Sequence, residues 1–304
     1  MRHAGVRATA KYRLCDVARA ARPDSGHSGV SSYQVHETVR DRRLGKEQMM
    51  SCLKIEVEDF VATVTLANPP VNSASVDMML ELTAAFDAFN ENPDVRAVLL
   101  TAEGKTFCAG ADLKNRPGPD APAGTAFARQ RMAREMSWSM VECSKPIVVA
   151  VNGAALGAGL GIVASCDIIV ASERAVFGLP EIDVGLAGGA KHALRFIPHS
   201  LARRMVLTGW RVPAEELYRR GLIEAALPHE AFLDYARNIA KEIASKSPVA
   251  VAAAKDSLNV IDNLSLRDGY RYEQGNTYKL SKSEDAKEAV RAFIEKRPPV
   301  FQGR

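Results

Sequence analysis

Apolar and polar residues alternate in two stretches near residue 50, Leu53–Val57 and Val61–Leu66. The turn-like pair Glu58-Asp59 separates them, so the two stretches are predicted to form a β-hairpin or two adjacent strands. Further along, the apolar residues of Val76–Asn90 recur at helical spacing, and Ser75 is placed to cap the N-terminus of that helix. The body of the chain therefore begins with two strands and a helix.

Short apolar runs then alternate with further helical stretches. The runs Ala97–Thr101, Ile147–Val151 and Ile168–Ala171 have the composition of strands that are covered on both faces. Helices are predicted between them, over Ala126–Glu142 and Gly157–Cys166. Strands that alternate with helices predict right-handed crossovers and a mostly parallel sheet, which is an α/β fold.

From His192 onward the pattern is almost entirely helical. Amphipathic stretches lie near residues 213–220, 230–246, 248–260, 265–279 and 282–295. No linker and no repeat of fixed period interrupts the body. We therefore expect three parts, namely an extension over residues 1–50, a core over residues 51–250 and a C-terminal helical region over residues 251–304.

The extension carries the positive charge of the chain. Residues 1–48 hold ten Lys/Arg and five Asp/Glu, which leaves 30 basic and 31 acidic residues in the remainder. The near-neutral body argues against a nucleic-acid-binding face. The Arg-rich start has a weak likeness to a mitochondrial transit peptide, but its acidic residues dilute that likeness. We favour a disordered extension, or a translation start at Met49 or Met50.

Composition argues against several other classes of protein. No apolar run approaches the roughly 18 residues needed to span a bilayer, so a membrane-embedded protein is not expected. The five cysteines show no CxxC pair or regular spacing, which indicates reduced thiols in a cytoplasmic compartment. The three histidines beyond residue 48 are not paired at metal-ligand spacing, so no metal site is expected.

Each of two turns of small residues follows a buried strand and leads into a helix. One turn, Lys105–Lys114, comes after Ala97–Thr101, and the other, Val151–Gly159, comes at the end of Ile147–Val151. Ligands of open α/β sheets bind at the carboxyl ends of the strands, and helix N-termini there present unpaired N–H groups. Two such groups that converge on one oxygen would form an oxyanion hole. Taken singly, each turn is better explained by tight packing of a helix against a strand.

Together the turns belong to a longer pattern. FCAGADLK is followed by AVNGAALGAGLGIVASCDIIVAS and then by AVFGLPEIDVGL. This pattern resembles the enoyl-CoA hydratase/isomerase (crotonase) superfamily, and the similarity runs from about Leu53 to Phe293–Arg297. The resemblance implies a crotonase-like spiral of ββα units over residues 51–250, with the acyl-CoA site. It implies a C-terminal helical region used in trimerisation, commonly in a dimer of trimers. It also implies an enzyme of acyl-CoA metabolism, for which coenzyme A is part of the substrate and no cofactor is needed.

The resemblance also implies roles for individual residues. The backbone amides of Ala109 and Ala158 would hold the thioester carbonyl and stabilise the enolate made from it. Glu181 would be the catalytic carboxylate. Phe293 and Lys296 would reach the nucleotide end of CoA from a neighbouring subunit. The substrate-binding set is Phe107, Ala109, Gly110, Ala111, Asp112, Leu113, Lys114, Gly161, Phe293 and Lys296.

One departure from the family pattern affects the predicted reaction. Typical hydratases carry two glutamates, of which the second is present here as Glu181, whereas the first position is Gly161. Adding water across C2=C3 is best achieved by two carboxylates, while one carboxylate suffices for a 1,3-proton shift. We therefore expect Glu181 to be the principal acid/base, and isomerisation or a specialised reaction to be favoured over hydration.

Several alternatives remain open. Asp183 would share a face with Glu181 if the segment were extended, whereas Asp112 is better interpreted as an acid that caps a helix. His192 lies near where members of the resembled family line the acyl pocket, although a surface or helix-capping histidine is the favoured interpretation. The function could also be that of a specialised hydratase-lyase or decarboxylase, or of a catalytically silent fold that binds CoA or RNA. Glu181 within FGLPEIDVG favours an enzyme, for which we expect fatty acid metabolism, a cytoplasmic location and a hexamer. The segment Asn115–Trp138 is expected to be a loop that lines the acyl pocket.

Overall fold

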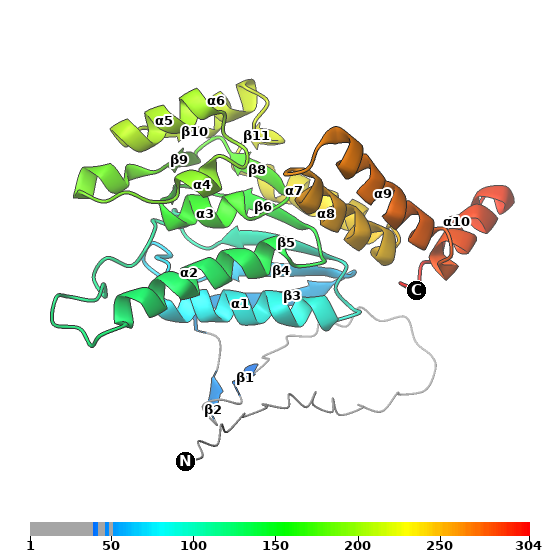
Figure 1. Cartoon of the computed structure of the whole chain (residues 1–304), viewed down its shortest axis with the longest axis horizontal. Helices are drawn as coiled ribbons and strands as arrows, with labels where there is room; N and C mark the ends of the chain where they lie inside the picture. The colour runs from blue at the N-terminus through cyan, green and yellow to red at the C-terminus, as the bar shows by residue number, and fades with distance from the viewer. Residues whose placement is uncertain (1–38, 42–45, 49–50) are drawn as a thin grey trace, which may run out of the picture. The chain divides into compact units, whose positions relative to one another are not determined.

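The computed structural model describes residues 39–41, 46–48 and 51–304 (Figure 1). Strands β1 (Val39–Asp41) and β2 (Lys46–Gln48) form an antiparallel ladder. These six residues fall within the extension expected over residues 1–50, and its disorder stays a prediction. The rest of that predicted extension lies outside the described residues.

A six-stranded sheet in the order β11-β8-β6-β5-β4-β3 forms the centre of the body. The predicted hairpin is present as β3 (Leu53–Glu58) and β4 (Val61–Leu66), which pair antiparallel. The other neighbouring strands pair parallel; they are β5 (Ala97–Ala102), β6 (Ile147–Val151), β8 (Ile168–Ser172) and β11 (Ala225–Leu227). The mostly parallel sheet predicted from the alternation of strands and helices is confirmed.

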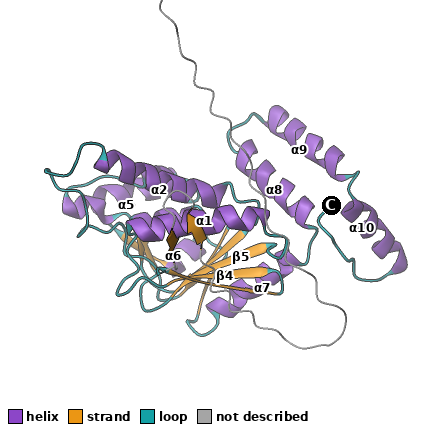
Figure 2. Ribbon diagram, turned by 90° about the horizontal axis from the view of Figure 1, so that it is seen from below, coloured by secondary structure: helices purple, strands orange, loops and turns teal. Residues whose placement is uncertain are grey.

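The two faces of the sheet pack into separate apolar layers. Successive side chains of a strand point to opposite faces, so in β6 Ile147 and Val149 join one layer while Val148 and Ala150 join the other. Figure 2 shows the helices on the two sides. The first face is covered by α1 (Val76–Glu91) and α2 (Thr125–Val141), and the second by α7 (Phe232–Ala244). This double cover explains why the central strands are apolar throughout.

The two long helices of the first layer begin at identifiable residues. The Ser75 hydroxyl accepts a hydrogen bond from the Met78 N–H at 3.2 Å, which confirms the predicted cap of α1. Helix α2 starts at Thr125, after Gly124 in the left-handed region. The loop that was expected over Asn115–Trp138 therefore ends at Gly124, because the remaining residues are helical.

A second, three-stranded sheet and several short helices follow. The sheet has the order β10-β9-β7, with β7 (Ala155–Leu156), β9 (Val176–Gly178) and β10 (Arg211–Pro213). The helices are α3 (Ala158–Ala164), the 3₁₀ helix η1 (Pro180–Val184), α4 (Ala190–Ala193), α5 (His199–Thr208) and α6 (Ala214–Arg219). These short elements position the candidate site.

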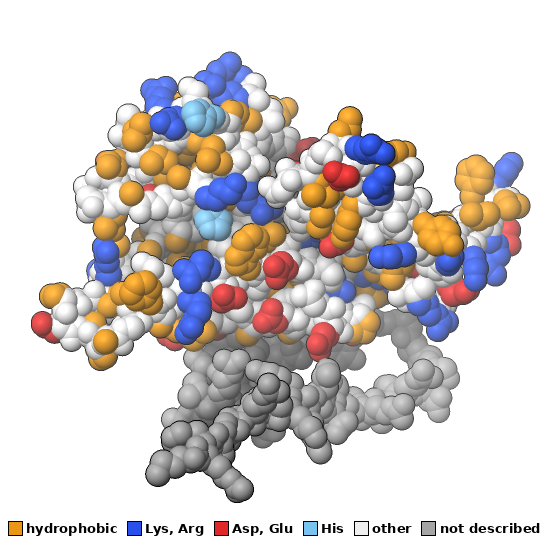
Figure 3. Space-filling model, in the orientation of Figure 1, with side chains coloured by type: hydrophobic (Ala, Val, Ile, Leu, Met, Phe, Trp, Pro, Cys, Tyr) orange, Lys and Arg blue, Asp and Glu red, His pale blue; other side chains and the backbone are white. Residues whose placement is uncertain are grey.

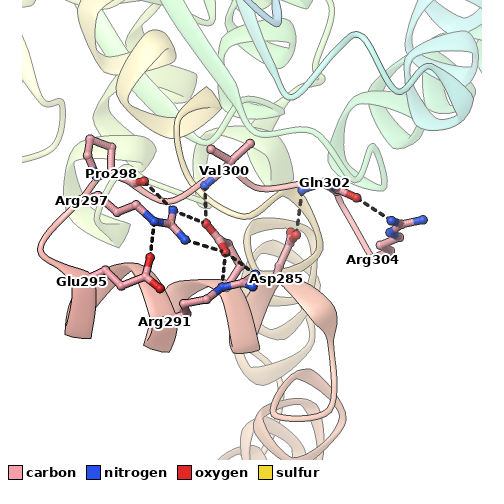
Figure 4. Close-up of polar contacts among 9 residues, drawn as sticks. Asp285, Arg291, Glu295, Arg297, Pro298, Val300, Gln302 and Arg304 are labelled. Atoms are coloured by element: carbon pink, nitrogen blue, oxygen red, sulfur yellow. Dashed lines mark hydrogen bonds and ion pairs between the residues drawn. The ribbon is translucent and has the colours of Figure 1, made fainter.

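The C-terminal region consists of α8 (Pro248–Ile261), α9 (Leu266–Leu280) and α10 (Glu284–Glu295). Each of these helices has a serine cap, and the boundary expected at residue 250 lies inside α8. The chain then folds back on α10. Figure 4 shows this contact, in which Asp285 accepts a hydrogen bond from the Gln302 N–H at 2.8 Å. Glu288 accepts one from Arg297 at 2.6 Å. Among the helices that the structure describes, none combines the length and apolar character needed to cross a membrane.

Candidate active site

The first small-residue turn forms a parallel bridge with the segment that precedes α1. The Ala74 N–H donates to the Gly110 carbonyl at 2.8 Å, and the Ala74 carbonyl accepts from the Asp112 N–H at 3.4 Å. These two bonds lie on either side of Ala111, whose own N–H points away from the bridge. Within the described part of the chain, the Ala111 N–H has no hydrogen-bond partner.

Ala109 differs from the sequence expectation. Its N–H, which was expected to hold a thioester carbonyl, donates to the Val71 carbonyl at 3.0 Å. Gly110, at a φ of 108°, interrupts the extended course of the chain between Ala109 and Ala111. The expectation for Ala109 is therefore corrected, because its donor is already used and the free donor of this turn belongs to Ala111.

The second turn is paired directly to the first. The Cys108 N–H donates to the Ala154 carbonyl at 3.0 Å, and the Leu156 N–H donates to the Cys108 carbonyl at 2.9 Å. Ala158 follows as the first residue of α3, where backbone N–H groups have no partner within the helix. Its N–H makes no hydrogen bond to any described residue, so the donor expected at Ala158 is free.

Glycines bring the two turns into contact. A Cβ on Gly110 would lie 3.1 Å from the Leu156 carbonyl oxygen and 3.8 Å from the Ala158 nitrogen. A Cβ on Gly153 or Gly159 would overlap the carbonyl oxygen of Lys105 or Cys108, respectively. Tight packing therefore explains Gly153 and Gly159, whereas Gly110 lies beside a free donor.

Glu181 lies on η1 and points at this contact. Its Oε1 is 2.9 Å from the position that a Cβ on Gly157 would take and 3.9 Å from the corresponding position on Gly189. Its Oε2 is buried and has no hydrogen-bond partner among the described residues. Burial raises the pKa of this carboxyl above its ordinary value of 4.5. A buried carboxylate oxygen without a partner is uncommon in folded proteins and is characteristic of functional sites.

His192 lies against the position of the missing glutamate. Two of its ring atoms, Cγ and Cδ2, are 4.0 Å from the point where a Cβ on Gly161 would be. The side chain is half-buried, so the interpretation of a surface or capping histidine is corrected. Burial, and secondarily the charge of Arg195, lowers the pKa of the imidazole below its ordinary value of 6.5.

The two aspartates considered as substitutes have other surroundings. The segment of Asp183 is a 3₁₀ helix and not a strand, so Asp183 does not share a face with Glu181. Its carboxylate packs against Gly209 at the end of α5. Asp112 accepts a hydrogen bond from the Lys114 N–H at 3.1 Å, which closes a turn. The helix cap expected at Asp112 is corrected, because the next helix begins only at Thr125.

The remaining predicted residues divide into exposed and buried ones. Leu113 and Lys114 are exposed beside the first turn. Phe107 is corrected as a ligand contact, because its side chain is fully buried in the core. Phe293 and Lys296 are exposed on and just after α10, which lies far from α3 and α4 within one chain (Figure 1).

Arg129 of α2 was not anticipated from the sequence. Its guanidinium donates to the backbone carbonyls of Asp112 and Asn115, each at 2.6 Å. The rigid fork of donors in arginine suits such paired acceptors. It fixes the loop that follows Ala111, and no sequence signal distinguishes it from the other arginines of α2.

Comparison with known proteins decides the family. A sequence profile of the enoyl-CoA hydratase/isomerase family matches residues 56–304. The chain belongs to this family. It is therefore an enzyme of the enoyl-CoA hydratase/isomerase, or crotonase, superfamily, as the sequence motifs indicated.

Individual family members are similar over most of their length. The chain is 37% identical, over 79% of its length and 93% of the relative, to the (7aS)-7a-methyl-1,5-dioxo-2,3,5,6,7,7a-hexahydro-1H-indene-carboxyl-CoA hydrolase of Rhodococcus jostii. It is 37% identical to a probable mitochondrial enoyl-CoA hydratase of Dictyostelium discoideum, over 82% and 90% of the two chains. The crystal structure of an enoyl-CoA hydratase from Bacillus anthracis matches with a TM-score of 0.78 and 31% identity, over 84% of this chain and 100% of that one. The crotonase-like α/β fold is thereby confirmed.

Proposed function

We propose that this enzyme binds an acyl-CoA thioester and stabilises the enolate formed from it. The oxyanion hole consists of the N–H groups of Ala111 and Ala158, and Glu181 is the acid/base. The observation that carries this proposal is the buried, unpartnered Oε2 of Glu181, which lies beside the turn that leads into α3. Two unpaired backbone donors on adjoining turns support it.

The chemistry follows from these three groups. The thioester oxygen accepts a hydrogen bond from each N–H, which draws electrons from the carbonyl and makes the C2 proton more acidic. The Glu181 carboxylate removes that proton, and the negative charge of the enolate develops on the oxygen between the two donors. Protonated Glu181 then returns the proton to the substrate. Desolvation of the carboxylate strengthens it as a base.

The substrate path uses the exposed part of the first turn. CoA lies along Gly110–Lys114, and the hydrogen bonds from Arg129 hold this loop in place. Phe107 supports the turn from the core and makes no side-chain contact with CoA. Fatty-acid-derived acyl groups are the proposed substrates.

The assembly is proposed to be a homotrimer or a dimer of trimers. Apolar side chains on α9 and α10 support this, because Leu266 is 92% exposed and Phe293 is 84% exposed in the single chain. On the face in Figure 3, hydrophobic side chains lie over these two helices at the right of the molecule. Phe293 and Lys296 are proposed to reach the CoA of a neighbouring subunit. The cytoplasm remains the proposed location, supported by the four free, buried cysteines of the described residues.

The test of the proposed reaction is exchange of the C2 protons of butyryl-CoA with D2O, followed by NMR. We expect Glu181→Gln to slow the exchange by about 10²–10⁴-fold, because the variant keeps the shape and lacks the base. The wild-type rate should rise as the pH rises through the elevated pKa of Glu181, since only the carboxylate accepts the proton. Binding of butyryl-CoA, measured by calorimetry, should be retained.

Glu173→Gln is the matched control, because Glu173 is an exposed glutamate after β8. It should leave both exchange and binding unchanged. Exchange that is equally fast in wild type and Glu181→Gln would contradict the assignment of Glu181 as the acid/base.

A further inference from the structure

Two titratable side chains approach one face of α3. The Glu181 carboxyl lies against Gly157, and the His192 imidazole lies against Gly161. The Gly161 N–H donates to the Gly157 carbonyl at 3.1 Å, so the two glycines are about one helical turn apart on the same face. The carboxyl and the imidazole therefore border the same small-residue surface.

The short helix α4 also places His192 near Glu181. Gly189, which precedes α4, is 3.9 Å from Glu181 Oε1 when measured from its Cβ position. His192 comes three residues later, about one turn further along the helix. Helices α3 and α4 pack against each other (Figure 1). Glu181 and His192 are thus brought together by two independent pairs of contacts.

The surroundings of the two groups push their proton affinities in opposite directions. No described residue hydrogen-bonds to the Oε2 of Glu181, and none hydrogen-bonds to the His192 ring. The raised pKa of Glu181 favours a carboxyl that can give a proton, while the lowered pKa of His192 favours a neutral imidazole that can take one. Both shifts come mainly from burial, which disfavours the charged form of each group and so leaves one neutral donor and one neutral acceptor beside the same surface.

We propose that His192 is the second proton-transfer residue of this site and activates water for addition to a 2-enoyl-CoA. The imidazole occupies the space next to Gly161, where the chain carries no carboxylate. The substrate class is accordingly an α,β-unsaturated acyl-CoA thioester. This proposal rests on the proposed function, because it requires the thioester to be held by Ala111 and Ala158.

Water addition moves two protons and the π electrons of the substrate. A ring nitrogen of His192 removes a proton from water, and the water oxygen forms a bond to C3. The π electrons of C2=C3 move toward the thioester, whose oxygen becomes the enolate oxygen in the oxyanion hole. Protonated Glu181 delivers its proton to C2 as the carbonyl re-forms. Solvent then carries the extra proton from the imidazolium of His192 to the carboxylate of Glu181.

The assignment changes the reaction expected from the sequence. Isomerisation or a specialised reaction was favoured over hydration because Gly161 replaces one of the two glutamates of typical hydratases. With His192 opposite Gly161, the site has both an acid and a base, and water addition becomes the expected reaction.

Two assays on the same proteins distinguish the role of His192 from that of Glu181. The first is C2-proton exchange of butyryl-CoA, and the second is hydration of crotonyl-CoA and cinnamoyl-CoA. In His192→Asn we expect hydration to fall by about 10²–10⁴-fold while exchange stays within about threefold of wild type. Glu181→Gln should lose both activities. His199→Asn is the matched control, since His199 is an exposed histidine on α5 and should affect neither.

Three results would overturn the proposal for His192. Hydration that is unchanged in His192→Asn would show that the imidazole does not activate water. Equal loss of hydration and exchange would show that His192 supports the site as a whole and not the water step. A wild type that exchanges C2 protons but hydrates neither thioester would also exclude the proposal. A wild type without exchange would instead contradict the proposed function itself.

Discussion

Gly110 lies at the contact between the two turns, and a side chain there would meet two obstacles. Its φ of 108° is a conformation that residues with a Cβ rarely adopt. A Cβ would also come within 3.1 Å of the Leu156 carbonyl oxygen and 3.8 Å of the Ala158 nitrogen. A methyl group at this position would therefore press on the Leu156 carbonyl and lie in van der Waals contact with one of the two donors of the proposed oxyanion hole.

Gly110→Ala is expected to reduce C2-proton exchange by about 10²-fold or more, the usual effect of losing one oxyanion-hole donor. Gly104→Ala is the matched control, because Gly104 also has a positive φ, 80°, but nothing lies within 4 Å of its Cβ position. The control should lose some thermal stability and keep its activity. The same loss of exchange in both variants would assign the effect to backbone strain.

The motifs predicted some site residues correctly and others not, for a physical reason. A free donor at Ala158 was foreseen, because a helix N-terminus has unpaired N–H groups wherever it occurs. It was not foreseen that the free donor belongs to Ala111 and not to Ala109. This depends on Val71, a residue distant in sequence whose carbonyl accepts a hydrogen bond from the Ala109 N–H. The contact of His192 with Gly161 was not foreseen for the same reason, because it exists only after folding.

At the scale of elements, α8 is attached to the core by a buried ammonium group. Lys255 is 5% exposed and pairs with Asp167 at 2.8 Å. It also donates to the carbonyls of Met140 at 3.3 Å and Lys145 at 3.1 Å. The C-terminal helices are thereby tied to the end of α2 and the start of β6.

Lys255→Ala is expected to lower the free energy of unfolding by about 2 kcal/mol, since two carbonyls and a carboxylate lose their donor. Lys241→Ala is the control, because Lys241 pairs with Asp59 at 3.0 Å in an exposed position. Its loss should cost about 0–1 kcal/mol. Urea unfolding measures both values, and equal effects would show that the buried pair does not hold α8.

The long elements could be predicted and the short ones could not. Strands such as β4 and helices such as α1 are long enough to show a period of alternating or helical positions. Strands β7, β9 and β10 have two or three residues each, so they carry no period and form through tertiary pairing. The 3₁₀ turn η1 was likewise missed, and it is this turn that separates Asp183 from Glu181.

At the scale of the whole molecule, apolar side chains on α9 and α10 remain uncovered in the single chain. Leu266, Phe293 and Ile294 are 92%, 84% and 72% exposed. Side chains of this size are normally buried when several of them gather on one region. The C-terminal helices therefore present the surface on which the proposed trimer would assemble.

Sedimentation analysis is expected to give the mass of a trimer or hexamer of 32.9-kDa chains. Leu266→Asp and Phe293→Asp should shift the protein toward monomer, because each buries a charge in the proposed interface. Leu207→Asp is the control, since Leu207 is 67% exposed on α5, outside the C-terminal helices. A monomeric wild type would contradict the proposed assembly.

The central claim is that one thioester oxygen binds to two backbone donors with its C2 facing Glu181. The most direct test is a crystal structure of the enzyme with bound butyryl-CoA. The account predicts that the thioester oxygen lies about 3 Å from the nitrogens of both Ala111 and Ala158, and that the Glu181 carboxylate contacts C2. A thioester oxygen bonded to neither nitrogen, or a C2 atom turned away from Glu181, would contradict the account.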